Sequence, residues 1–238
     1  MRHSKAPRIM PEDAMNLETF TLEGPHVRLE PLEPRHIEGL VTAAAADPSL
    51  YQWTLVPQGT EGMTKYAETA LAAREAGTAM PFATVNRASG AVIGCTRYFD
   101  IDRWAWPAAH PMARRTTPDF CEIGYTWLTR PAIRTAANTE AKLLMLTHAF
   151  EAWQVFRVCL HTDARNAQSR AAMERIGAQF EGILRAYRLA SDITPRNSAR
   201  YSIVASEWPG VKERLTGMME RYATQDSPKP VKIPVQLT

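Results

Sequence analysis

The segment from Arg134 to Glu140 can bind an anion, because it leads into a predicted helix. The first turn of a helix leaves backbone N–H groups without partners, and the helix dipole places positive charge at the same end. Together these features favour a phosphate or a pyrophosphate. Asn138 and Glu140 also suit helix capping, so capping and anion binding use the same helix end.

Asn166 and Ser169 form an N-x-x-S pattern where another helix is expected to begin. N-capping is a common use of these two residue types and is the simpler interpretation. The arginines outnumber the lysines and supply forked donors suited to phosphates. The net charge of +3 is small and no long basic run occurs, which weighs against nucleic acid as a partner.

Metal chemistry and covalent catalysis find little support in the sequence. His148 and His161 have no partner at metal-ligand spacing, so no metal is expected. Cys95, Cys121 and Cys159 lie in separate apolar runs and are predicted to be buried, reduced thiols. The chain contains neither G-x-S-x-G nor G-x-x-x-x-G-K-[ST], which argues against an α/β-hydrolase and a nucleotide hydrolase.

Alternating and helical periodicities predict the elements that position these residues. Strands are expected at 27–32, 81–86, 91–99, 121–128, 157–162, 179–189 and 200–205, and helices at 34–47, 64–75, 139–153 and 168–176. No stretch approaches the roughly 20 apolar residues that span a bilayer, and no apolar signal core opens the chain. No membrane association and a cytoplasmic, reducing location are therefore predicted.

The segment from residue 100 to 119 breaks these periodicities and reads as a long irregular connection. It carries Trp104, Trp106 and Arg114, whose aromatic and arginine side chains suit a flat or anionic ligand. We consider it a candidate lid over a substrate. A surface loop that packs on its own tryptophans explains the same residues equally well.

Four runs occur in one order: Cys121-Glu-Ile-Gly-Tyr-Thr-Trp-Leu128, Arg134-Thr-Ala-Ala-Asn-Thr-Glu140, Thr162-Asp-Ala-Arg-Asn-Ala-Gln-Ser-Arg170 and Glu174-Arg-Ile-Gly-Ala178. Together they resemble the GNAT superfamily of N-acetyltransferases, on its RimJ/RimL-like branch, over residues 18 to 215. The resemblance implies the α/β GNAT fold, with a central, mostly antiparallel split sheet of about seven strands flanked by helices. The domain is expected at 18–222, between a flexible extension at 1–17 and a flexible tail at 223–238.

The resemblance also implies acetyl-CoA as cosubstrate. Its pyrophosphate would lie on the loop formed by Arg134, Thr135, Ala136, Ala137, Asn138 and Thr139. The superfamily pattern Q/R-x-x-G-x-G/A falls here on Ile133, Ala136 and Asn138, so both glycine places are altered. Trp127 and Leu128 would offer backbone groups to the pantetheine arm and the thioester oxygen. The family's use of Asn166 is to hold the same arm.

By the same resemblance Glu122 is the candidate general base for the attacking amine, with a salt bridge at a strand edge as the alternative. The tyrosine that many members place after N-x-x-S is here Met173. Ser169 is the first choice for protonating the departing thiolate, and Tyr125 is the second. A thiolate that leaves unprotonated is the remaining alternative.

These residues predict an acyl-CoA-dependent N-acyltransferase that moves an acetyl group to a primary amine by direct attack in a ternary complex. The amine would be a protein N-terminus or a small molecule, with Trp104, Trp106 and Arg114 as candidate acceptor contacts. Two alternatives remain: an antibiotic self-resistance N-acetyltransferase and a catalytically silent GNAT module that senses CoA or a metabolite. Exposed edges of a split sheet also allow a homodimer.

Overall fold

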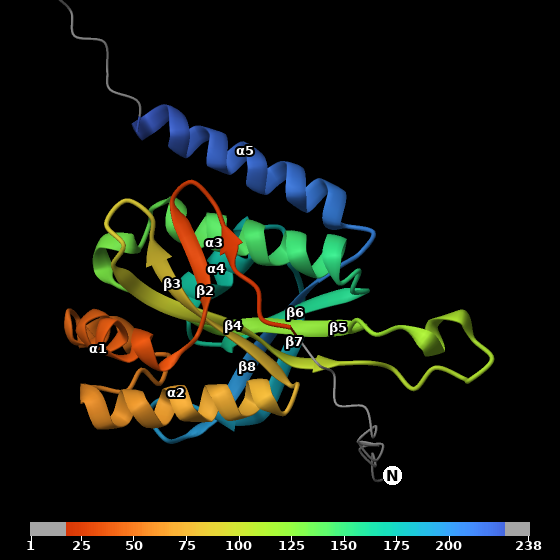
Figure 1. Cartoon of the computed structure of the whole chain (residues 1–238), viewed down its shortest axis with the longest axis horizontal. Coiled ribbons are helices and arrows are strands. Elements are labelled where there is room, and N and C mark those ends of the chain that lie inside the picture. Colours follow the sequence, from red (N-terminus) through yellow and green to blue (C-terminus); the bar gives the residue numbers. More distant parts are fainter. Residues whose placement is uncertain (1–17, 227–238) are drawn as a thin grey trace, which may run out of the picture.

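A computed structural model describes residues 18–226 and centres on an eight-stranded sheet in the order β1-β2-β3-β4-β5-β6-β8-β7 (Figure 1). Every neighbouring pair is antiparallel except β5 and β6. The strands are β1 (Leu22–Glu23), β2 (Val27–Pro31), β3 (Ala79–Asn86), β4 (Val92–Asp102), β5 (Phe120–Leu128), β6 (Arg157–Asp163), β7 (Gln179–Leu189) and β8 (Pro195–Val204).

Helices cover both faces of this sheet (Figure 1). The helices α1 (Ile37–Ala45) and α2 (Gly59–Glu75) lie below it in the view, and α3 (Ala136–Thr147), α4 (Ala167–Arg175) and α5 (Trp208–Asp226) lie above it. Successive side chains of a strand point to opposite faces. Phe82 accordingly joins the core under α3 and α5, while its neighbour Ala83 joins the core shared with α1 and α2.

The sheet opens between β5 and β6. These two strands run parallel and pair over three residues only, from Phe120 opposite Arg157 to Glu122 opposite Cys159. Farther along β5, three residue steps from Gly124 to Trp127 face only two steps from Arg97 to Cys95 on β4, which is a β-bulge. Tyr125 in this bulge has a φ of 51°. The bulge and the short pairing leave β5 with unpaired backbone beside an opening in the sheet.

The predicted α/β fold with a mostly antiparallel sheet is confirmed, with eight strands rather than about seven. The extra strand is the two-residue β1, and β8 begins at Pro195 rather than at residue 200. The 3-10 turn Pro34–His36 precedes α1 within the first predicted helix. The helix predicted at 139–153 begins instead at Ala136, because Thr135 is its N-cap, and it passes into a π-helical turn at His148–Ala152.

Helix α5 was not predicted as an element. It ends at Asp226, so it includes residues 223–226, which were expected to belong to the tail. Its buried Trp208, Val211, Leu215 and Met218 follow a helical period, which is the signal that sequence reasoning passed over. The predicted extension at 1–17 and the remainder of the tail at 227–238 lie outside the described residues.

Within residues 18–226 no helix is both long enough and apolar enough to cross a bilayer. The three cysteines are buried and form no disulfide, as expected.

Candidate active site

A cavity of about 970 Å³ passes through the opening between β5 and β6. From the face of α3 and α4 it is lined by residues such as Asn138 and Ser169, and from the other face by His161 and Arg196. Residues of both strands beside the opening also line it. A ligand in this cavity therefore contacts both faces of the sheet.

Glu122 and His161 contact each other beside this opening. Nδ1 of His161 contacts Oε1 of Glu122, and both side chains are buried. Glu122 lies on β5 opposite Cys159 of β6, and His161 follows two residues later on the same face, so the parallel pairing brings the two side chains together. A carboxylate without a proton only accepts hydrogen bonds, so a hydrogen bond to it requires the proton on Nδ1 and leaves Nε2 on the far side of the ring.

His161, rather than Glu122, reaches the cavity. His161 belongs to the cavity wall, whereas Glu122 does not. Among the described residues, no partner is bonded to Nε2 of His161. The carboxylate of Glu122 lies behind the imidazole, so its predicted role as general base stays a prediction that would have to act through His161 or a water. Nothing in the sequence indicates that His161 belongs to this site, since only the strand register shows that it faces Glu122.

Rings surround the His161 side of the cavity. Phe99 packs edge-on against both His161 and Tyr125, at centroid distances of 6.1 and 5.1 Å. The guanidinium of Arg97 lies 4.0 Å from the ring centroid of Tyr125. Tyr125 lines the cavity as predicted for a candidate acid, and 42% of its surface is exposed.

The N-terminus of α3 closes the other end of the cavity. Thr135 caps the helix: its hydroxyl accepts from the N–H of Ala137 and donates to the carbonyl of Ala132. The N–H groups of Ala136 and Asn138 make no hydrogen bond to another described residue. Arg134, with a φ of 62°, lines the cavity beside them. Free N–H groups and an arginine at a helix N-terminus fit a diphosphate.

Some predicted cofactor residues serve the fold instead. The hydroxyl of Thr139 is buried and accepts from Nη2 of Arg175, and it does not line the cavity. Ala136 and Ala137 bury their side chains in the protein and leave only backbone groups for a ligand. Glu140 does not cap α3, contrary to expectation: Oε2 accepts from the backbone N–H groups of His26 and Val27.

Trp127, Leu128, Asn166, Ser169 and Met173 all line the cavity. Oδ1 of Asn166 accepts from the N–H of Ser169, which is the predicted N-cap of α4. The hydroxyl of Ser169 makes no hydrogen bond to another described residue. It therefore stays available to a ligand, beside the methionine that occupies the usual tyrosine place.

Lys142 is a buried cation that sequence reasoning did not single out. It projects from α3 into the cavity wall, and Nζ donates to Oγ1 of Thr126 at 2.9 Å. Burial lowers the pKa of this ammonium from 10.5 to about 7. Nothing in the sequence marks Lys142 as buried, because a lysine among apolar neighbours on a helix usually extends its ammonium group to solvent.

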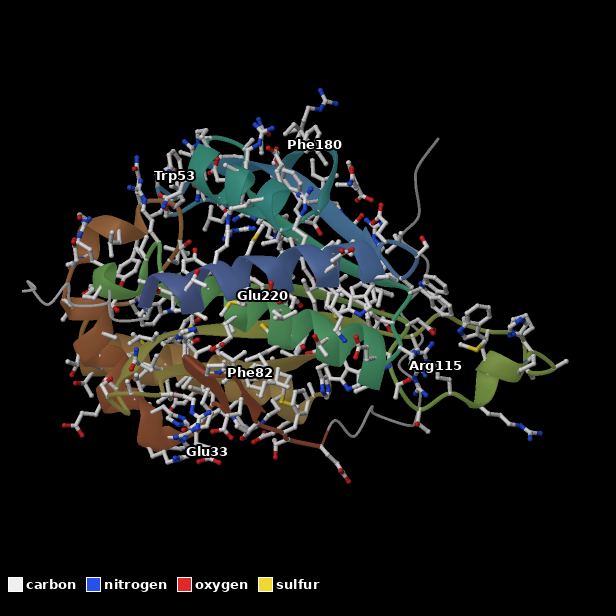
Figure 2. All side chains as sticks on the ribbon, turned by 90° about the horizontal axis from the view of Figure 1, so that it is seen from above. Glu33, Trp53, Phe82, Arg115, Phe180 and Glu220 are labelled. Carbon is white, nitrogen blue, oxygen red and sulfur yellow. The ribbon has the colours of Figure 1, made fainter. Side chains whose placement is uncertain are left out.

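The predicted lid lies away from the cavity. Trp104 stacks on Phe156 at 5.2 Å, and Nε1 of Trp106 donates to Asp119. Neither these tryptophans nor Arg114 line the cavity. In Figure 2, Arg115 of this segment and Trp53 of the cavity wall lie toward opposite ends of the molecule. The cavity therefore gives no support to the prediction that Trp104, Trp106 and Arg114 contact the acceptor, and the contacts of the two tryptophans fit the alternative of a loop that packs on itself.

The residues that the structure describes contain no candidate metal site. No cluster of three or more histidine, cysteine, aspartate or glutamate side chains suited to a metal ion occurs among the described residues.

Comparison with known proteins places this site in a family context. A family model described as an acetyltransferase (GNAT) domain matches residues 26–179. A GCN5-related N-acetyltransferase from Brucella melitensis is 28% identical, with a TM-score of 0.72 over 85% of this chain and 86% of that one. A putative acetyltransferase from T. thermophilus is 31% identical, with a TM-score of 0.68 over 85% of this chain and 100% of that one.

RimJ from Mycobacterium smegmatis, solved with CoA-disulfide, shares the fold at 21% identity, with a TM-score of 0.67 over 84% of this chain and 94% of that one. None of the curated proteins is significantly similar to the chain.

Proposed function

The chain belongs to the GNAT family of acetyltransferases, and from this premise we propose that it moves an acetyl group from acetyl-CoA to a primary amine by direct attack in a ternary complex. The observation that carries the proposal is the continuous cavity that joins the α3 N-terminus to the Glu122–His161 pair. It lets a donor and an acceptor meet at the opening between β5 and β6.

The donor side is assigned to the α3 end of the cavity. Arg134 and the free N–H groups of Ala136 and Asn138 hold the diphosphate, where the helix dipole adds positive charge. The backbone of Trp127 and Leu128 extends the unpaired edge of β5 toward the pantetheine amides and the thioester oxygen. Asn166 contacts the same arm from α4.

His161 is the proposed base. As the amine nitrogen bonds to the thioester carbonyl carbon, its proton passes to Nε2 of His161, and the carbon–sulfur bond breaks with its electron pair on sulfur. Glu122 acts through His161 as a positioning residue that fixes the tautomer and stabilises the imidazolium. The hydroxyl of Ser169 protonates the thiolate and regains a proton from solvent, with Tyr125 as the second candidate. The buried cysteines form no covalent intermediate in this scheme.

A thiol-release assay tests the proposal. Acetyl-CoA is offered with pooled peptides, amino acids, polyamines and aminoglycosides, and His161→Ala and Glu122→Gln are assayed beside the wild type. Release with one pool, lowered in both variants, supports the transferase and identifies its acceptor class. Release with the aminoglycoside pool alone would favour an antibiotic-modifying enzyme.

A silent CoA-binding module is the second candidate, favoured by Ile133, Ala136 and Asn138 in the phosphate loop and by Met173 at the tyrosine place. Calorimetric binding of acetyl-CoA with no release from any pool would support that module and reject the transferase.

A further inference from the structure

Two arginines face each other on the acceptor side of the cavity. Arg188 of β7 and Arg196 of β8 are direct cross-strand partners, and both line the cavity. Directly opposite side chains on a sheet stand only about 5 Å apart at Cβ, and like charges in such a pair destabilise it. A site of this kind favours an anion between the two guanidinium groups.

Each arginine leaves a buried donor without a partner. Nε of Arg188 and Nη2 of Arg196 are buried and unbonded. The other groups are only partly engaged: Arg188 reaches the half-exposed Asp100 at 3.3 Å, and Nε of Arg196 donates to Ser198 at 2.9 Å. Burial, together with the charge of Arg188, lowers the pKa of Arg196. Unsatisfied buried donors are costly, so a ligand that accepts from them is stabilising.

The cavity wall offers these arginines no carboxylate. Among its described lining residues there is no aspartate or glutamate, whereas Arg134, Lys142 and Arg175 add further positive charge toward the α3 side. Asp163 and Glu122 lie in electrostatic range of Arg196, but Asp163 is bonded to Arg165 and Glu122 to His161. Among the described residues, Asp100 is thus the only carboxylate bonded to the pair, and Arg196 has none, so a ligand can supply the missing counter-ion.

The pair also lies close to the proposed base. The guanidinium carbon of Arg188 stands 5.5 Å from the ring centroid of Phe99, and that ring packs on His161 at 6.1 Å. One aromatic ring thus separates the arginine from the imidazole. A short acceptor can place its amine at His161 and its acid group at the arginines.

We propose that Arg188 and Arg196 form a carboxylate-binding site, and that the acceptor is an amine that carries a carboxylate near its nitrogen. The inference rests on the proposed function and narrows its acceptor to a class. Free α-amino acids and peptides with an acidic residue next to the N-terminus share this chemistry.

The first experiment compares acceptors that differ only in charge. Thiol release is measured with α-amino acids against their amides, and with tripeptides that carry glutamate or glutamine at the second position. We expect the acid member of at least one pair to have a KM about 10- to 100-fold lower, the range of a charge-assisted hydrogen bond. The pair whose acid member has the lower KM shows whether the acceptor is a free amino acid or a peptide. Equal KM values within every pair would overturn the proposal.

The second experiment removes each guanidinium. Arg188→Gln and Arg196→Gln should raise the KM of the acid acceptor about tenfold or more and leave its amide and acetyl-CoA unchanged. Arg185→Gln, an exposed arginine of β7 outside the cavity wall, is the matched control and should change nothing. A raised KM for acetyl-CoA instead would assign the arginines to the donor and reject the proposal. Melting temperatures confirm that each variant folds.

Binding separates failure of this site from failure of the proposed function. Calorimetry with the CoA-saturated wild type compares glutamate with its diamide, which has no carboxylate, and reports on the anion site without turnover. Binding of glutamate that is lost in Arg196→Gln would support the carboxylate site even if no amine releases thiol. Turnover of amines with no preference for acids would keep the transferase and reject the site.

Discussion

His161 stands between Glu122 and the cavity: its Nδ1 contacts the carboxylate, while the ring itself lines the cavity wall. A parallel pair of strands brings the two residues together from positions 39 apart in the chain. In the proposed mechanism His161 contacts the amine, and Glu122 acts through His161.

The pair should therefore behave as one unit in kinetics. We expect His161→Ala to lower kcat by about 10² to 10⁴, the usual contribution of a general base, and Glu122→Gln to lower it less. The double variant should be no slower than His161→Ala alone, because the carboxylate acts only through the ring. A further drop in the double variant, at unchanged melting temperature, would show that Glu122 has an independent role.

Ser169 offers a test of the departing thiolate. Its hydroxyl lines the cavity and makes no hydrogen bond to another described residue. Ser169→Ala should lower kcat by about tenfold or more if this hydroxyl protonates the sulfur. Adding Met173→Tyr, at the place where related enzymes carry tyrosine, should restore part of that loss. An unchanged kcat in Ser169→Ala would transfer the role to Tyr125, and Tyr125→Phe would then be the variant to assay.

Lys142 makes a prediction about stability and pH. Lys142 loses its proton near pH 7 in the folded chain and near pH 10.5 in the unfolded chain. Between these pH values the unfolded state therefore binds more protons than the folded state. The free energy of unfolding of the wild type should rise through this window by a few kcal/mol. In Lys142→Met this rise should be absent. The gain in the free energy of unfolding of Lys142→Met over the wild type should therefore be largest below pH 7. Urea titrations at pH 6, 8 and 10 measure it.

The control for this prediction is Lys65→Met, which changes an exposed lysine of α2. Its pH slope should match that of the wild type. An equal slope in Lys142→Met and the wild type would show that Lys142 keeps its ordinary titration in the folded protein.

Glu140 makes a prediction about folding alone. Its Oε2 accepts from His26 and Val27, residues 114 and 113 positions away, and thereby fixes the β1–β2 turn on α3. Glu140→Ala leaves two backbone donors without their acceptor and should destabilise the fold by about 2 to 5 kcal/mol. Glu140→Gln keeps one acceptor oxygen and should cost less. Urea unfolding measures both, with Glu38→Ala at an exposed position of α1 as control.

Local patterns in the sequence were sufficient for most strands and for the N-cap of α4. Alternation at 121–128 and 157–162 predicted the strands that carry Glu122 and His161, and the N-x-x-S pattern placed Asn166 at the N-cap of α4. The start of α3 was missed because Asn138 and Glu140 also suit helix capping. The hydroxyl of Thr135 caps the helix instead, so α3 begins at Ala136.

The remainder of the site depends on strand register, which local patterns do not contain. The contact between His161 and Glu122 requires the parallel alignment of β5 and β6. Arg188 and Arg196 become partners only through the pairing of β7 with β8, which includes register shifts. Tryptophans and an arginine drew attention to residues 104–114, but the two tryptophans pack on each other and Trp104 also packs on Phe156.

The three-residue pairing of β5 with β6 has a consequence for how the two substrates share the molecule. On the proposed assignment, the donor enters from the α3 face and the acceptor from the face of Arg188 and Arg196, so each has its own entrance and neither blocks the other. The lining residues toward α3 and α4 and those beside the two arginines also come from separate stretches of chain, 133–142 and 166–176 on the donor side and 188–196 on the acceptor side. Substitutions in the stretch that carries Arg188 and Arg196 can therefore change which amine is accepted, while binding of the donor stays the same.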